Sequence, residues 1–143
     1  MTTAGEVMTR APVTIRLSAR VREAIEVLDS LEVRHLPVVN EDGELIGMLS
    51  DRTLDAIWVS TAGERARHLP GRAVLDAPLS SLMSGHRFAA VEARTDAARV
   101  IGVMLDSHVG AVPVVDPAGA LLGLVSYMDV LRAWPFPAVE MDG

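Results

Sequence analysis

Near the C-terminal end, the stretch Gly123–Asp129 reads GLVSYMD and sets the hydroxyl of Ser126 three residues before the carboxylate of Asp129. An ionised carboxylate only accepts hydrogen bonds, so Asp129 is suited to take them from two donors at once. Ser126 is suited to bond a further hydroxyl, or a phosphate at a helix start, where backbone N–H groups favour an anion. Charge-assisted bonds of this kind contribute about 1.5–3 kcal/mol each. The stretch therefore predicts a helix start that can hold an anion, with a carboxylate acceptor beside it.

The same two residues have a second interpretation that needs no ligand. Ser-x-x-Asp is close to a capping box, in which the serine side chain and the later carboxylate each bond a backbone N–H at the helix start. Such a box would stabilise a helix that begins after Ser126. The two roles are compatible, because a cap can be shared with a ligand or displaced by it. Both interpretations stay open at this point.

The elements that must position this site are written twice. One copy, residues 34–54, reads RHLPVVNEDGELIGMLSDRTL, and the other, residues 110–130, reads GAVPVVDPAGALLGLVSYMDV. Pro37 and Pro113 lie 76 residues apart, as do Gly47 and Gly123. Each copy has a valine-rich strand, a turn containing Asp and Gly, a return strand and a helix start. A repeat at one fixed offset indicates a duplicated supersecondary unit.

The first copy departs from the second where the chemistry would occur. Its stretch from Gly47 reads GMLSDRT, so that Ser50 is kept but Thr53 stands at the position of the aspartate. A threonine hydroxyl makes a neutral hydrogen bond and cannot replace the two charged acceptor oxygens of a carboxylate. The two copies therefore predict unequal sites, with the stronger one built around Asp129.

Further elements flank each hairpin. We expect a short strand at residues 13–15 and a helix from Val21 to about Glu32, preceded by Ser18 as its cap. In the second half we expect a strand at 88–91 and a helix that Thr95 caps and that runs to about His108. The apolar spacing assigns a buried face to each helix. The predicted inward residues are Val21, Ala24, Ile25, Leu28 and Leu31 in the first helix and Ala97, Val100, Ile101 and Met104 in the second.

The domain organisation follows from these elements. A first repeat is predicted at residues 6–60 and a second at 76–134, with a basic linker at 61–75 and a tail at 135–143. The linker contains glycine, proline and arginine, a composition typical of a solvated loop. At 143 residues, half of them apolar, the chain is long enough for one sizeable core.

Composition excludes several classes of chemistry. The formal charge of −6 argues against a nucleic-acid polymer as partner, since that needs a basic surface. The chain has no cysteine and no lysine, which excludes disulfides, thiolate nucleophiles and lysine Schiff bases. The four histidines show no metal-ligand spacing, and no nucleophile–base set is visible. No apolar run reaches the length of a membrane span, so we expect a cytoplasmic protein. Because no metal-ligand spacing and no nucleophile–base set is visible, we also expect that it is not an enzyme and uses no metal.

The hairpin pattern P-V-V, turn, G-h-h-S, where h is apolar, resembles that of a tandem pair of cystathionine-β-synthase-type (CBS) domains, the regulatory unit called a Bateman module. The resemblance covers roughly residues 6–134. It implies an α/β (α+β) fold of two βαββα repeats packed about a pseudo-two-fold axis. It also implies clefts between the repeats that hold AMP, ADP, ATP or S-adenosylmethionine in many relatives. Modules of this family commonly form homodimers.

The resemblance also implies which residues would complete each cleft. The family's ribose pattern is G-h-h-[ST]-x-x-D, intact only in the second copy. Residues at the start of the other repeat would contact the adenine, and those just before P-V-V would face the phosphates. Arg34 is among the latter, since its guanidinium is suited to phosphate. The alternative role of Arg34 is an ion pair with Asp29 or Glu32 at the surface. The stronger cleft would comprise Met8, Val13, Thr14, Val33, Arg34, His35, Ser126 and Asp129. The weaker cleft would comprise Ser50, Thr53, Met83, Ala89 and Gly110.

Two functions from different classes are consistent with these residues. The first is a stand-alone regulatory module that binds an adenosine-type nucleotide without a catalytic cofactor and signals to a protein partner in trans. The second is a dimerisation or scaffold protein with the same fold and no ligand, which the lost carboxylate at Thr53 favours for one cleft. A change of melting temperature with nucleotides separates the two.

Overall fold

The computed structural model describes residues 1–31, 33–50, 72–83 and 86–135. The chain divides into two compact units, each of which is described by itself. One unit combines Met1–Pro12 with Ala89–Gly143, and the other is Val13–Phe88. Within the described residues, no helix is both long and apolar enough to cross a lipid bilayer.

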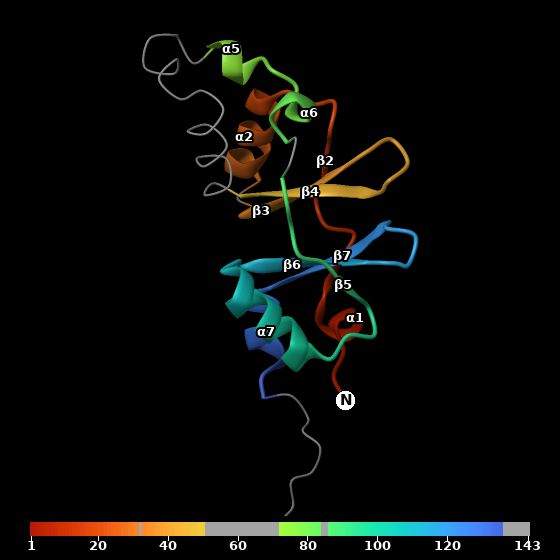
Figure 1. The fold of residues 1–143 in the computed structure, drawn as a ribbon. Helices are drawn as coiled ribbons and strands as arrows, with labels where there is room; N and C mark the ends of the chain where they lie inside the picture. The colour runs from red at the N-terminus through yellow and green to blue at the C-terminus, as the bar shows by residue number, and fades with distance from the viewer. Residues whose placement is uncertain (32, 51–71, 84–85, 136–143) are drawn as a thin grey trace, which may run out of the picture. The chain divides into compact units, whose positions relative to one another are not determined.

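The unit that carries the second hairpin is a four-stranded sheet with the strand order β1-β7-β6-β5 (Figure 1). The chain passes through it in the order β5, α7, β6, β7, α8, which is the predicted βαββα repeat. The N-terminal α1 and β1 join it from the far end of the sequence. The elements are α1 (Ala4–Val7), β1 (Thr9–Arg10), β5 (Val91–Glu92), α7 (Ala97–Ser107), β6 (Ala111–Val115), β7 (Leu121–Ser126) and α8 (Tyr127–Ala133).

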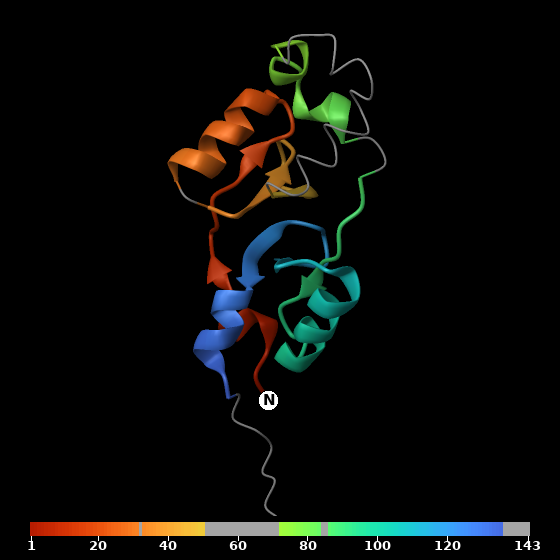
Figure 2. The same cartoon turned by 90° about the vertical axis from the view of Figure 1, so that its left-hand side faces the viewer.

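The unit that carries the first hairpin is a three-stranded sheet with the order β2-β3-β4. Its β2 pairs in parallel with β3, and β3 pairs antiparallel with β4. Helix α2 lies along this sheet in both ribbon views (Figure 2). The elements are β2 (Ile15–Arg16), α2 (Val21–Ser30), β3 (His35–Val39), β4 (Leu45–Ser50), α5 (Arg72–Leu75) and α6 (Leu79–Leu82). The helix expected after Ser50 lies outside the described residues.

The two hairpins repeat each other in register. His35 pairs with Ser50 in one, and Ala111 pairs with Ser126 in the other, again 76 residues apart. The turns also match, because Asn40 and Asp116 each accept two backbone N–H bonds of 2.9 Å with one side-chain oxygen. Each turn continues through a glycine with φ of 82° or 93°, a backbone conformation that favours glycine. The predicted duplication and tight turns are confirmed.

The compact units do not coincide with the sequence repeats. Residues 6–12 are predicted with the first repeat, yet β1 pairs with β7 of the second hairpin. In return, residues 76–88 pack with the first hairpin, where Leu79 and Met83 are part of the core. Each hairpin thus takes its leading segment from the other half of the chain. Sequence periodicity cannot indicate such an exchange, because it depends on which sheet edge a distant segment pairs with.

The helices differ from prediction in their ends and in two inward residues. Arg20 precedes α2 and the Asp96 carboxylate caps α7, so the expected caps Ser18 and Thr95 are wrong. Ile25 of α2 and Leu31, the residue just after it, are 41% and 56% exposed, whereas Val21, Ala24 and Leu28 are buried as predicted. The sheet in this unit covers only one narrow stripe of the helix, so positions at its margin stay in solvent.

The short strands before the helices also begin later than expected. They start at Ile15 and Val91 rather than at residues 13 and 88. Each is fixed by the parallel pairing of one buried residue, Ile15 with Val38 and Val91 with Val114. The residues before Ile15 and Val91 make no ladder pair, so each strand begins at one of these two residues.

Candidate functional site

Asp129 is a buried carboxylate at the start of α8, with 7% of its surface exposed. Its Oδ2 accepts hydrogen bonds from the backbone N–H and the Oγ of Ser126, at 2.9 and 3.0 Å. The backbone N–H of Asp129 donates to the Ser126 Oγ at 3.3 Å. The predicted capping box is therefore present. Because burial of a polar group is costly unless it is hydrogen-bonded, these bonds offset the cost of placing the Asp129 side chain away from water.

Two further donors reach the other carboxylate oxygen of Asp129. The Oγ1 of Thr9, on β1, donates to Oδ1 over 2.9 Å. Arg132, one helical turn further along α8, donates from Nη1 to the same oxygen over 3.3 Å, although its side chain is 70% exposed. The carboxylate therefore binds donors from its own cap, from its own helix and from the remote N-terminal strand.

Gly123 is what allows β1 to approach. Thr9 and Arg10 pair with Leu124 and Gly123 of β7. A Cβ atom on Gly123 would lie 2.5 Å from the Met8 Sδ and 2.8 Å from the Thr9 carbonyl oxygen, too close for any side chain. The glycine that opens the binding pattern thus has a packing role: it leaves room for the strand that brings Thr9 to Asp129.

The first hairpin repeats this packing with different partners. A Cβ atom on Gly47 would clash with Met83 and would lie 2.9 Å from the His86 Cδ2. Met83 thus occupies the place beside Gly47 that Met8 occupies beside Gly123. The Nε2 of His86 accepts a 3.3 Å bond from the Met48 N–H, and burial lowers the pKa of His86 below its usual 6.5. Thr53 lies outside the described residues, and Ser50 ends β4.

The remaining residues predicted for the stronger site divide between the two units. Met8 belongs with Ser126 and Asp129 and packs against the core of their unit. Val13, Thr14, Val33, Arg34 and His35 belong to the other unit. Arg34 is exposed and, among the described residues, makes no ion pair, so the alternative of a pairing with Asp29 is absent. His35 is half-buried at the start of β3.

The residues predicted for the weaker site divide in the same way. Ser50 and the buried Met83 lie in the unit of the first hairpin. Ala89 and Gly110 lie in the unit of the second, where the Gly110 carbonyl accepts a bond from the Tyr127 N–H. In the described part of the chain, no cluster of His, Asp or Glu could hold a metal ion.

Thr9 and Arg132 are the contacts that sequence reasoning missed. A signal for Thr9 was available, because both halves place a hydroxyl residue after the aligned methionine, Met8-Thr9 and Met83-Ser84. Its bond partner is 120 residues away, however, so no local pattern could name Asp129 as the acceptor.

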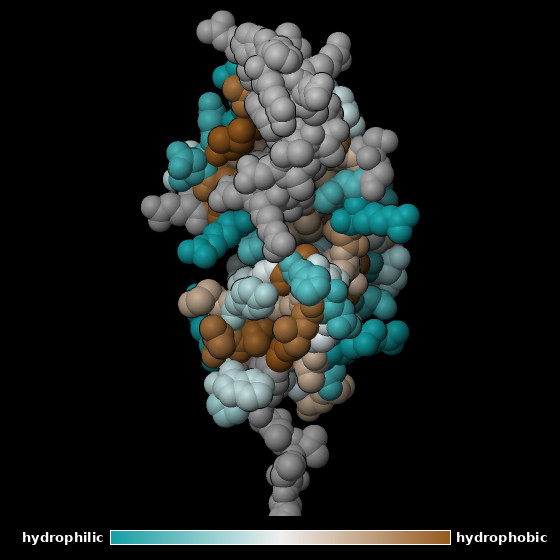
Figure 3. All heavy atoms as spheres, turned by 60° about the vertical axis from the view of Figure 1, so that its left-hand side comes forward, coloured by the Kyte–Doolittle hydropathy of each residue, from teal (hydrophilic) through white to brown (hydrophobic). Residues whose placement is uncertain are grey.

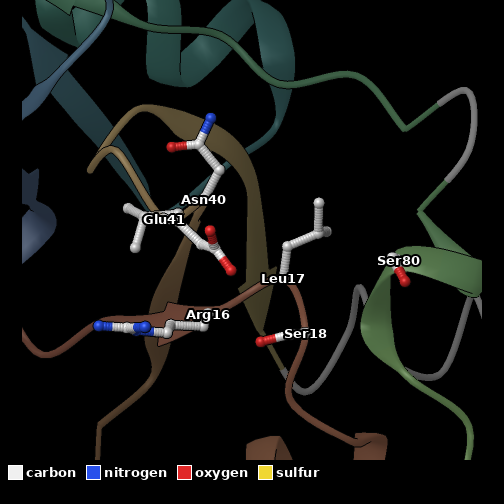
Figure 4. A pocket seen from close by; sticks show the side chains of 7 residues that line it. Arg16, Leu17, Ser18, Asn40, Glu41 and Ser80 are labelled. Carbon is white, nitrogen blue, oxygen red and sulfur yellow. The ribbon is translucent and has the colours of Figure 1, made fainter.

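A separate concavity of about 210 Å³ lies in the unit of the first hairpin, between the end of β2, the β3–β4 turn and α6 (Figure 4). Arg16, Ser18, Asn40, Glu41 and Ser80 contribute its polar atoms. The Asn40 amide is already committed to the turn, and the other four side chains are exposed. The concavity is a solvated surface hollow.

The amino-acid sequence matches a known family over most of the chain. The CBS domain family matches residues 4–57 and 79–135. A CBS domain-containing protein of Dictyostelium discoideum is 29% identical over 131 residues, which cover 88% of this chain and 86% of that protein. An inosine-5'-monophosphate dehydrogenase of Aquifex aeolicus is 23% identical over 131 residues, 92% of this chain. The chain spans about a quarter of that enzyme's length, since the match covers 24% of it.

Solved structures give the same result for the fold. The structure of CBSX2 in complex with AMP matches with a TM-score of 0.71 and 25% sequence identity, over 93% of this chain and 96% of that one. The mixed α/β class and the two-repeat architecture are thereby confirmed. With family matches in two copies over most of its length, the chain belongs to the CBS domain family and comprises a tandem pair of CBS domains.

Proposed function

We propose that this chain is a regulatory, non-catalytic module that binds an adenosine-type nucleotide, AMP, ADP, ATP or S-adenosylmethionine, with the ribose on Asp129. The observation that carries the proposal is the buried carboxyl group of Asp129 in an intact G-h-h-S-x-x-D pattern, held in place by Ser126. A solved CBS-pair structure at 25% identity contains AMP, which supports the choice of ligand class. No catalytic cofactor takes part.

The chemistry of binding follows from the donor and acceptor types. Asp129 accepts hydrogen bonds from the two ribose hydroxyls, and Ser126 bonds a hydroxyl or a phosphate oxygen. Arg34 and His35 supply charged or polar donors to the phosphates, with the arginine as the stronger because its planar fork matches phosphate oxygens. Met8, Val13 and Thr14 offer apolar and backbone contacts to the adenine, and Val33 lies beside Arg34 and His35 on the phosphate side. The module acts as a homodimer and passes the ligand signal to a partner protein.

Regulation by such a ligand is a shift between arrangements of the module. A nucleotide favours one arrangement over another only by as much as its affinity for the two differs. A coupling of about 1–3 kcal/mol is typical and is enough to change the affinity for a partner by roughly 5- to 150-fold.

The test is calorimetric titration of the purified protein with AMP, ATP and S-adenosylmethionine. We expect Asp129→Asn, which keeps the shape of the side chain, to weaken binding about 10- to 100-fold, the effect of losing charged hydrogen bonds. Thr53→Ala should change the affinity much less, because a neutral hydroxyl contributes less than a carboxylate. A matched control is Asp96→Asn, which alters a helix cap of the same unit and should leave binding unchanged. Equal losses from Asp129→Asn and Thr53→Ala would contradict the unequal-site proposal.

A ligand-free dimerisation or scaffold protein is the second candidate, and one observation favours it. Tyr127, Met128, Leu131 and Trp134 are 52%, 57%, 64% and 62% exposed, along one side of α8 and just beyond its end. Leu105 of α7 is 65% exposed, and apolar side chains gather on the face of α7 and α8 (Figure 3). Apolar groups collected on one helix face are typical of an interaction surface. A protein that dimerises but responds to no nucleotide in the titrations would support this candidate.

A further inference from the structure

We infer that the Thr9 hydroxyl competes with the ribose for Asp129, so that the N-terminal strand β1 holds the carboxylate occupied until a diol displaces it. This inference rests on the proposed function and adds a means of regulating it. It makes Thr9 a residue that lowers nucleotide affinity and so sets the ligand concentration to which the module responds.

The carboxylate of Asp129 already accepts four hydrogen bonds. Its Oδ2 accepts from the N–H and the Oγ of Ser126, and its Oδ1 accepts from Thr9 and Arg132. A carboxylate offers about four lone-pair sites, and these four donors use all of them. A ribose therefore cannot add its two hydroxyls to the existing bonds; it must replace some of them.

The bonds on Asp129 differ in how readily a ribose can displace them. The bond from the Ser126 N–H to Oδ2 is part of the capping box and persists as long as α8 begins at this position. The Ser126 Oγ also accepts from the Asp129 N–H in this box, which keeps its own bond to Oδ2 in place. The bond from Arg132 is long at 3.3 Å and comes from a flexible side chain that is 70% exposed. The 2.9 Å bond from Thr9 is therefore the main obstacle at Oδ1.

The backbone of Thr9 is held in a fixed position. Thr9 lies on β1, whose pairing with Leu124 and Gly123 fixes the backbone from which the hydroxyl extends. The Thr9 carbonyl oxygen lies 2.8 Å from where a Cβ on Gly123 would stand, so β1 packs closely against β7. A donor that is held in position loses little entropy when it bonds, which makes it an effective intramolecular competitor.

Thr9 would then lower ribose affinity by roughly the strength of one hydrogen bond to a charged acceptor. Loss of that bond before the ligand arrives should improve the apparent affinity by about 10-fold. A residue that only positions Asp129 would act in the opposite direction, because its removal would loosen the carboxylate and weaken binding.

The experiment compares Thr9→Val, which keeps the shape and removes the donor, with Thr9→Ser, which keeps the donor. Calorimetric titration with AMP should give about 10-fold tighter binding to Thr9→Val than to the wild-type protein, and near wild-type binding to Thr9→Ser. The ligand control is 2',3'-dideoxy-AMP, which has no hydroxyls to compete for Asp129 and should bind both variants equally. Thermal unfolding without ligand should show Thr9→Val to be the less stable of the two.

The outcomes separate the inference from the function on which it rests. If the wild-type protein binds AMP but Thr9→Val binds it equally or more weakly, the competition is refuted and the proposed function stands. A gain in affinity that is the same for AMP and for the dideoxy compound also refutes it. If neither the wild-type protein nor Thr9→Val binds AMP, the proposed function and the inference both fall.

Discussion

The backbone N–H of Met48, in the edge strand β4, donates a 3.3 Å hydrogen bond to Nε2 of His86. The imidazole also stacks on Phe88, with the ring centroids 6.4 Å apart. An imidazole nitrogen accepts a hydrogen bond only when it carries no proton, so this contact requires neutral His86. Together with Met83, the ring fills the space beside Gly47.

This contact predicts a loss of stability in mild acid. Burial lowers the pKa of His86 in the folded state below the ordinary 6.5, so the unfolded chain binds the proton more readily. The contribution of His86 is complete above pH 6.5 and is lost as the pH falls from there through the folded-state pKa. Melting temperatures of the wild-type protein across this range should therefore fall more than those of His86→Gln, whose amide oxygen accepts the same bond but does not titrate. Parallel pH profiles of the two proteins would contradict the prediction.

The two motif glycines predict unequal tolerance of a methyl group. In Gly123→Ala the new Cβ meets the Thr9 carbonyl, which the β1–β7 pairing holds in place. In Gly47→Ala it meets the ends of the Met83 and His86 side chains, which can turn aside. We expect Gly123→Ala to lower the free energy of unfolding by about 1–3 kcal/mol and Gly47→Ala to lower it less. Denaturant unfolding of both variants measures the difference, and the reverse order would refute this account.

Arg34 provides a test of the proposed phosphate contact. If its guanidinium bonds the phosphate, Arg34→Gln should weaken the binding of AMP by about 10-fold and leave the binding of adenosine unchanged. Arg16→Gln, at another exposed arginine of the same unit, is the matched control. An equal loss for AMP and adenosine would assign Arg34 a role in packing instead.

The exposed apolar face of α8 predicts the surface used for dimerisation. Leu131→Glu puts a charge at a side chain that is 64% exposed, so it should preserve the fold and prevent burial of this face. Light scattering should then give a mass near 15.3 kDa, whereas the wild-type protein should give twice that value. Leu122→Glu makes the same change on β7, at a side chain 37% exposed, and should leave the dimer intact. A wild-type mass of one chain would contradict the proposed homodimer.

Much of the site could be predicted because its signals are local. The 76-residue offset defined both hairpins, and their turns formed as expected, since Asn40 and Asp116 bond backbone groups only two and four residues ahead. The cap at Ser126 was one of two interpretations of its spacing to Asp129, and it is present. Helix caps at Ser18 and Thr95 were wrong because several neighbouring polar residues can cap, and packing selects the residue at which a helix begins.

By itself, then, the sequence determined the duplicated hairpins, their turns and the residue types of the candidate site, because short-range hydrogen bonds and apolar periodicity specify these features. Only the tertiary structure decided that residues 1–12 pack on the second hairpin and residues 76–88 on the first. It also decided that Thr9 bonds Asp129 and that Met48 bonds His86. These contacts depend on which sheet edge accepts a distant segment. The segments approach Gly47 and Gly123 closely, and no pattern of neighbouring residues indicates these long-range pairings.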